Sequence, residues 1–209
     1  MVHLIDVEHL QGGKMLRLFL GMLLVSSIHA QAKVVKCGGG VEFNKIIEVE
    51  NGDGIPTLLD LNGIGKKRVL FFNVFYAALY LEETSNDSAT ILNSDQLKVG
   101  MIHATRNITK KQLTDLFNDE FDRLCEDKCD KMRPAHDQFI SYIRPINNGE
   151  RLTLVVMRDR LEMDINGDEF FDPIHDPDYG DFLSRLLIGP DAADADLKKG
   201  LLGKLNLCR

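Results

Sequence analysis

Three cations stand close together near the middle of the sequence, at Arg106, Lys110 and Lys111. We predict that Arg106 follows a strand and that both lysines fall in the first turn of a helix. Free backbone N–H groups at a helix start and a guanidinium group both favour an anion such as a carboxylate. The cluster therefore predicts an anion-binding site that uses Arg106 and Lys110. The alternative is that the lysines are solvated and that Arg106 pairs with Asp115 or Glu120.

The motifs of several common enzyme classes are absent from the sequence. It holds no GxSxG elbow, no phosphate-binding glycine loop, no HExxH and no CxxC pair. The sequence therefore lacks the residues that the usual hydrolases, kinases, metalloproteases and thioredoxins require. Beyond residue 32, single histidines stand at His103, His136 and His175. We interpret each as a surface or core residue, and we predict no cofactor.

An acidic segment from Asp164 to Asp181 begins like a calcium-binding loop. Its first residues follow the EF-hand pattern, but the sixth position is Glu169 where glycine is required. The twelfth is His175, where a bidentate glutamate belongs. We therefore expect a solvated hairpin and loop here, and no metal site.

Four cysteines, Cys37, Cys125, Cys129 and Cys208, leave three disulfide pairings open. Cys125 and Cys129 fit a local disulfide, half of a metal site or two inert thiols. A structural zinc site normally requires a second pair of ligands at a similar spacing. Cys37 and Cys208 are single and remote, so a disulfide is favoured over a metal.

The elements that must position these groups begin with two predicted strands. Leu58 to Gly65 is a short strand that runs into a turn at Gly63 and Gly65, where glycine supplies backbone freedom. Arg68 to Leu81 is a strand with apolar residues on both faces, which predicts a central strand covered on both sides. The next predicted elements are a short helix capped by Asn86-Asp87-Ser88 and ending at Leu92, and a strand from Leu97 to Thr105.

The clearest predicted helix follows Thr109-Lys110-Lys111-Gln112, which has the form of a capping box. Apolar residues then recur at helical spacing up to Leu124. The later predicted elements are a helix within Pro134 to Ile143, strands at Leu152 to Met157 and Leu161 to Ile165, a hairpin turn at Asn166-Gly167, and short helices at Phe182 to Ile188 and Leu197 to Leu202. This order predicts an α+β fold with an antiparallel sheet and helices on one face.

The composition is that of one globular domain: 209 residues, of which 44% are hydrophobic and 27% are charged. Lys and Arg number 25 against 32 Asp and Glu, for a net charge of -7. A nucleic-acid partner needs a basic face to release phosphate counterions, so this class is disfavoured. A small-molecule or protein partner fits better.

The first 32 residues have the features of a secretory signal peptide. Lys14 and Arg17 precede an apolar run at 18–25, and Ala30-Gln31-Ala32 forms a cleavage site. The run is too short to span a bilayer. We predict a signal peptide at 1–32, with Met15 favoured as the true start, and a single domain at 33–209. The protein is then periplasmic or secreted with no membrane span; the alternative is an N-terminal helix that is amphipathic or buried.

The segment from Leu61 to Leu81 resembles the opening of the chalcone isomerase-like domain of bacterial exported proteins. Three later blocks resemble that family in the same order: Ile91 to Asp95, Ile108 to Leu113, and Gly189-Pro190 followed by Leu197 to Gly203. The likeness covers roughly Leu58 to Gly203. It implies an open-faced β-sandwich, in which helices cover a large antiparallel sheet and a ligand cleft lies between them.

The plant enzymes of this family close a chalcone to a flavanone, and an arginine stabilises the developing enolate. The resemblance places this catalytic cation at Lys67 or Arg68. The family's threonine and tyrosine positions fall at Phe75 and Leu113, which cannot donate hydrogen bonds. Efficient chalcone cyclisation is therefore disfavoured.

Other members of the fold are fatty-acid-binding proteins, with an apolar cleft and a cationic anchor. By this resemblance Phe72, Tyr76 and Tyr80 line one side of the cleft, and Arg106 meets the carboxylate. Plain core packing is the alternative for the aromatic residues. We predict an exported protein that binds a small apolar carboxylate such as a fatty acid. Two alternatives stay open: an isomerase (intramolecular lyase) acting on a chalcone-like or polyketide ketone, and a scaffold with a filled core.

Overall fold

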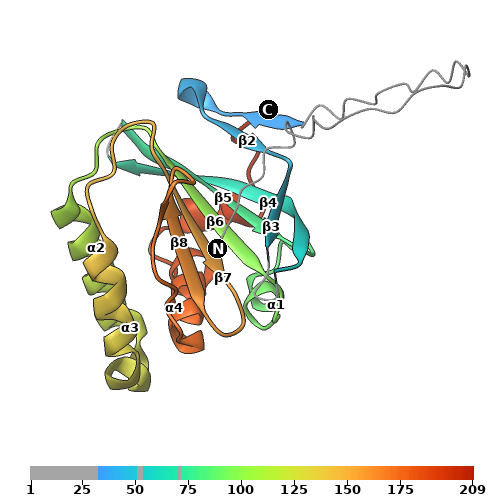
Figure 1. The fold of residues 1–209 in the computed structure, drawn as a ribbon. Helices are drawn as coiled ribbons and strands as arrows, with labels where there is room; N and C mark the ends of the chain where they lie inside the picture. Colours follow the sequence, from blue (N-terminus) through green and yellow to red (C-terminus); the bar gives the residue numbers. More distant parts are fainter. Residues whose placement is uncertain (1–32, 51–53, 70–71) are drawn as a thin grey trace, which may run out of the picture.

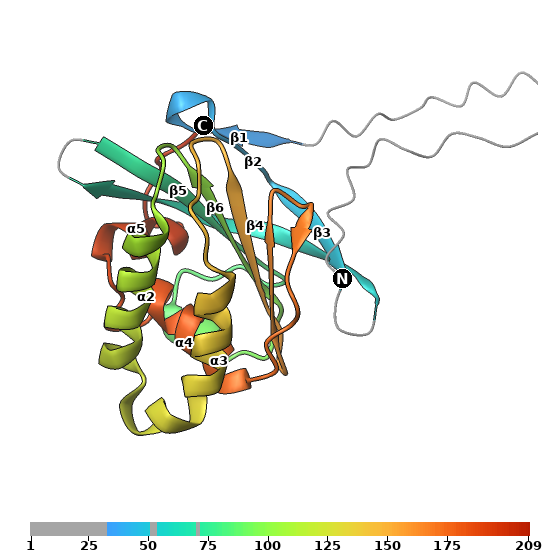
Figure 2. The ribbon, with the colours of Figure 1, turned by 60° about the vertical axis from the view of Figure 1, so that its left-hand side comes forward.

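The computed structural model describes residues 33–50, 54–69 and 72–209. A seven-stranded antiparallel sheet carries helices on one of its faces (Figures 1 and 2). The strands follow one another in chain order: β3 (Ile46–Glu50), β4 (Pro56–Val69), β5 (Phe72–Leu81), β6 (Lys98–Ala104), β7 (Arg151–Val156), β8 (Leu161–Ile165) and β9 (Glu169–Phe170). The predicted α+β class and open-faced architecture are confirmed.

Five helices lie on what we call the helix face of the described part of the sheet: α1 (Ser88–Leu92), α2 (Lys110–Leu124), α3 (Cys129–Tyr142), α4 (Pro177–Ile188) and α5 (Ala195–Leu201). The opposite face, which we call the ribbon face, is covered by the two-stranded ribbon of β1 (Val34–Lys36) and β2 (Glu42–Asn44), joined by the 3-10 turn η1 (Gly38–Gly40). None of the helices in the described residues is long and apolar enough to span a bilayer. The predicted signal peptide at 1–32 lies outside the described residues.

Strand β5 is central and buried on both sides, as predicted. Its Ala77, Leu79 and Leu81 pack against apolar side chains of α4 and α5 on the helix face. Tyr76 and Tyr80 pack on the ribbon face. Because successive strand residues point to opposite faces, a strand that is apolar at every position joins the two layers.

One predicted strand boundary is wrong. The run from Arg68 to Leu81 is divided between two strands, since β4 ends at Val69 and β5 begins at Phe72. Leu70 and Phe71, which fall within the predicted strand, lie outside the described residues. The segment from Val69 to Phe72 is apolar throughout and contains no turn-forming residue, so its pattern does not show the break.

Gly63 and Gly65 lie inside β4 rather than in the predicted turn. A Cβ at Gly65 would stand 2.4 Å from the carbonyl oxygen of Leu197, and one at Gly63 would stand 2.3 Å from that of Gly200. Helix α5 therefore rests directly on the backbone of β4, and glycine is required for the close approach and not for a turn.

Local capping signals predicted the helix starts well. Asp87 accepts a hydrogen bond from the Thr90 N–H at 2.9 Å at the start of α1, and the Thr109 capping box begins α2. Asn166 and Gly167 have positive φ angles of 60° and 79° and connect β8 to β9. Helix α3, however, begins at Cys129, with Pro134 in its interior.

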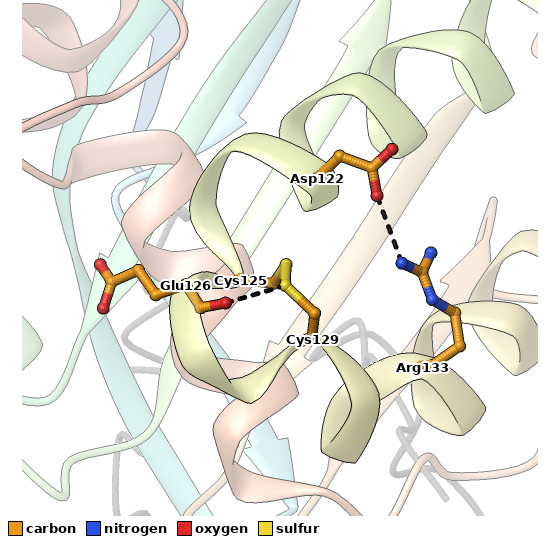
Figure 3. The surroundings of a disulfide bond; sticks show 5 residues. All are labelled: Asp122, Cys125, Glu126, Cys129 and Arg133. Carbon is orange, nitrogen blue, oxygen red and sulfur yellow. Dashed lines mark hydrogen bonds and ion pairs between the residues drawn. A yellow bond between two sulfur atoms is a disulfide. The ribbon is translucent and has the colours of Figure 1, made fainter.

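Both cysteine pairs are disulfide-bonded. Cys37 is joined to Cys208 across a sequence separation of 171, and Cys125 to Cys129. The first bond ties the β1–β2 ribbon to the C-terminus. The second spans the corner between α2 and α3, where the short helix η2 (Glu126–Lys128) lies (Figure 3). Of the three states left open for Cys125 and Cys129, the local disulfide is the one formed.

His136 joins three helices in the core, and its environment predicts a pH effect on stability. Its imidazole lies 3.1 Å from the Tyr179 hydroxyl of α4 and 2.9 Å from the Asn118 amide oxygen of α2. Burial, with a smaller contribution from Arg133, lowers the pKa of His136. In the unfolded chain this pKa returns to about 6.5. Unfolding is therefore accompanied by uptake of a proton below pH 6.5. The contribution of neutral His136 to the free energy of unfolding is complete above that pH and is lost as the pH falls toward the folded pKa.

We expect the free energy of unfolding, measured in urea at pH 5 and pH 7, to depend less on pH in His136→Gln than in the wild type. His175→Gln is the control, because His175 is exposed. Equal pH dependence in His136→Gln and the wild type would contradict this assignment.

Candidate functional site

A small cavity of about 30 Å³ lies between the sheet and α4. Strands β5, β6 and β7 form its floor and α4 its roof. Its walls are almost entirely apolar, and its lining residues are Leu79, Lys98, Gly100, Leu154, Val156, Leu183, Ser184, Leu187 and Ile188. The Ser184 hydroxyl is engaged, since it donates to the carbonyl oxygen of Gly180 at 3.1 Å. Lys98 is the charged residue among those that line the cavity.

Lys98 is 7% exposed and carries its charge into the layer between sheet and helices. Its Nζ donates to the carbonyl oxygens of Ser94 at 2.8 Å and Gln96 at 3.4 Å. Within the described residues, no carboxylate lies within 4.0 Å of this nitrogen. An ammonium group has three hydrogens, so the two carbonyls leave one available.

Burial sets the electrostatics of this lysine. Desolvation lowers the pKa of Lys98, and the more distant charges of Asp181, Asp95 and Glu82 oppose that shift. A buried cation held mainly by neutral carbonyls is only partly compensated, because ionised groups lose much of their hydration when they leave water. The site therefore favours an anion next to Lys98, with an apolar remainder in the cavity.

Lys98 is not among the site residues predicted from the sequence. The pattern shows a lysine at the start of an otherwise apolar strand, and alternation places it on the same face as Gly100 and Ile102. Nothing in that pattern identifies this face as the one covered by α4, because β6 is apolar on both sides. The arrangement of layers brings Lys98 to the cavity.

The structure brings two of the predicted residues together at the molecular surface. The guanidinium group of Arg106 lies 4.8 Å from the centroid of the Phe72 ring. Phe72 is 58% exposed. Arg106 follows the C-terminal end of β6, whereas Lys98 begins that strand, so this pair and the cavity lie at opposite ends of β6.

The other members of the predicted cation cluster are exposed at the start of α2. Lys111 forms an ion pair with Asp115 at 2.6 Å, and Glu120 pairs with Arg123. Asp115 and Glu120, the alternative partners considered for Arg106, are therefore engaged elsewhere. Lys110 is exposed and lies in the first turn of the helix, as predicted.

The predicted positions of Tyr76 and Tyr80 in a sheet–helix cleft need correction. Both side chains are buried on the ribbon face, at 3% and 0% exposure. The Tyr80 hydroxyl donates to the carbonyl oxygen of Asn44 at 2.9 Å, and burial raises the pKa of this tyrosine. The register of β5 assigns Ala77 and Leu79 to the helix face, so both tyrosines must point the other way.

A family model described as chalcone isomerase-like matches residues 36–203. The chain belongs to the chalcone isomerase-like family. Among solved structures, this chalcone isomerase-like chain is similar to a fatty-acid binding protein of Arabidopsis thaliana, with a TM-score of 0.59 and 14% identity over 81% of this chain and 96% of that protein. At this identity the likeness shows a shared fold. No protein with a curated description matches the sequence significantly.

The two cations marked by the chalcone isomerase-like resemblance have partners within the chain. Lys67 points to the helix face and forms an ion pair with Asp194 at 2.9 Å. Asp194 also caps α5, accepting hydrogen bonds from the N–H groups of Asp196 and Leu197. The Arg68 side chain donates to the amide oxygen of Asn73 at 3.3 Å. In this structure Lys67 therefore helps to hold α5 on β4.

Proposed function

We propose that this chalcone isomerase-like protein binds a small apolar carboxylate, for which a fatty acid is the model, between β5–β7 and α4. One observation carries the proposal: the buried side chain of Lys98 is part of the lining of an apolar cavity, and its ammonium group keeps one hydrogen for a further acceptor. The fold shared with a fatty-acid binding protein supports the same ligand class.

The two ends of the ligand are bound by different interactions. The carboxylate accepts a hydrogen bond from Lys98 and compensates its charge, and a hydrogen bond to a charged group contributes about 1.5–3 kcal/mol. The apolar chain lies against Leu79, Leu154 and Leu187. Each methylene removed from water adds about 0.8 kcal/mol.

The ligand must enlarge the cavity in order to enter. A volume of about 30 Å³ accommodates only one or two water molecules. A fatty acid therefore requires α4 to move away from the sheet. Surface ion pairs connect α4 to neighbouring elements, from Asp178 to Lys128 and Lys131 and from Arg185 to Glu126. Exposed ion pairs contribute little stability, so they oppose such a movement only weakly.

We also propose that the protein acts outside the cytoplasm. The signal-peptide features of residues 1–32 support export. The two disulfides support it as well, because such bonds form and persist in oxidising compartments.

The test is palmitate binding, measured by displacement of a fluorescent fatty acid from the wild type, Lys98→Met and Arg106→Met. We expect Lys98→Met to weaken binding about 10- to 100-fold, the equivalent of one lost hydrogen bond to a charged group. Methionine keeps the length of the side chain but leaves the carbonyl oxygens of Ser94 and Gln96 without their donor, so some loss of stability accompanies the substitution. Arg106→Met removes an exposed cation at the other end of β6 and should bind like the wild type.

Absence of palmitate binding by the wild type would overturn the proposed function. Normal binding by Lys98→Met with weakened binding by Arg106→Met would overturn the site and return the anchor to the residue predicted from the sequence. Thermal unfolding of each variant shows that the comparison is between folded proteins.

A further inference from the structure

The β4–β5 hairpin carries exposed apolar side chains next to its end. Val69 and Phe72 are directly paired across the two strands, and they are 53% and 58% exposed. Figure 2 shows the paired ends of β4 and β5 projecting past α5. We call the two side chains the hairpin tip. An apolar pair held in water on a projecting hairpin has no role in packing the core.

Two cations lie next to the hairpin tip, and a third, Lys66, lies further along β4 with its ammonium group 5.8 Å from the centroid of the Tyr76 ring. Arg106 lies over the Phe72 ring, and Arg68 immediately precedes Val69. Lys66 comes two residues before Arg68 on the same strand. Within the described part of the chain, no carboxylate lies within 4.0 Å of these three side chains.

The cations at the tip also repel one another. The pKa of Lys66 is lowered, first by burial and then by the charge of Arg68. An anionic surface placed against the tip would relieve this repulsion. The whole chain carries a net charge of -7, so the tip is a local exception and would orient the molecule in front of such a surface.

We propose that the hairpin tip docks on an anionic lipid membrane, with Val69 and Phe72 inserted at the interface and Lys66, Arg68 and Arg106 at the level of the headgroups. Aromatic and aliphatic side chains ringed by cations are the composition that binds such interfaces. The membrane is also the phase in which an apolar carboxylate accumulates, although docking itself does not require the proposed ligand site.

The experiment is co-sedimentation of the protein with vesicles of phosphatidylcholine alone or with 30% phosphatidylglycerol, at low and at high salt. We expect binding to the anionic vesicles at low salt, little binding to the neutral ones, and release by salt. Each cation near an anionic surface contributes about a fivefold factor. Arg68→Gln/Arg106→Gln should therefore weaken binding roughly 30-fold, and Phe72→Ser should weaken it about tenfold.

Matched controls separate the tip from general surface properties. Leu58→Ser removes a 64% exposed apolar side chain from the same strand, away from the tip. Lys45→Gln/Arg158→Gln removes two cations that lie elsewhere on the fold. Both controls should bind vesicles like the wild type, and so should Lys98→Met, which makes the result independent of the palmitate test.

Three outcomes would overturn docking. The first is that the wild type binds neutral and anionic vesicles equally, or binds neither. The second is that the control variants lose as much binding as the tip variants. The third is that Phe72→Ser leaves vesicle binding unchanged and alters only the oligomeric state measured by light scattering. The last result would assign the tip to contact with a second copy of the chain.

Discussion

Replacing both Cys37 and Cys208 by alanine should lower the free energy of unfolding by about 5 kcal/mol. The bond joins residues 171 apart in sequence and so constrains almost the whole unfolded domain. The chain entropy that a cross-link removes from the unfolded state grows with the length of the loop that it closes. Denaturation in guanidinium chloride under non-reducing conditions measures the effect.

The same bond fastens a covering layer in the folded protein. Lys36 and Arg209 exchange two backbone hydrogen bonds, at 2.6 Å and 2.9 Å, directly beside the disulfide. Val35 and Phe43 of the ribbon pack on the ribbon face of the sheet. Loss of the bond therefore also loosens the side chains that cover Tyr76 and Tyr80.

The second disulfide is the natural control. Cys125 and Cys129 are only four residues apart, so the Cys125→Ala/Cys129→Ala variant should lose about 2 kcal/mol in the same assay. In Figure 3 their bond lies at a helix corner, with the Cys129 sulfur 3.0 Å from the carbonyl oxygen of Glu126 and the ion pair of Asp122 with Arg133 nearby. Equal losses in the two double variants would contradict a loop-closure origin for the stabilisation.

Gly65→Ala should destabilise the domain by about 3 kcal/mol, the upper end of the usual cost of overpacking. The new methyl group would stand 2.4 Å from the carbonyl oxygen of Leu197 and 2.7 Å from its Cδ1. The closer atom belongs to the backbone of α5 and cannot turn aside, so the helix must move off β4. That movement also strains the ion pair of Lys67 with Asp194, which lies at the same contact.

The matched control is Gly100→Ala on β6. An added methyl group there meets only the Cδ1 atom of Leu187, at the ordinary contact distance of 3.7 Å. The same substitution should change stability by less than about 0.5 kcal/mol, because replacing glycine in a strand also reduces the entropy of the unfolded chain. Urea denaturation of both variants tests the difference. Similar denaturation midpoints would contradict the prediction, because they would show that α5 moves off β4 at little cost in free energy.

Gly100→Ala carries a second consequence, for the ligand site. Gly100 lines the cavity beneath α4, so its new methyl group takes up space that the proposed ligand needs. A fully stable Gly100→Ala protein with weakened palmitate binding would agree with the position of the site.

Short-range patterns predicted a large part of this fold. The cap of α1, the capping box of α2 and the turn at Asn166-Gly167 depend on interactions within about four residues, which the order of side chains displays directly. The α+β class followed from the order of such elements. The family resemblance extended these predictions to the layers of the fold.

The placement of the site required the folded chain. A strand that is apolar on both faces does not indicate which face the helices cover, so the sequence predicts Tyr80 in the cleft and does not identify Lys98 as a site residue. The pairing of Cys37 with Cys208 and the role of Gly65 likewise depend on segments more than a hundred residues away. Contacts across such separations arise from the packing of whole layers, and no local pattern of residue types encodes them.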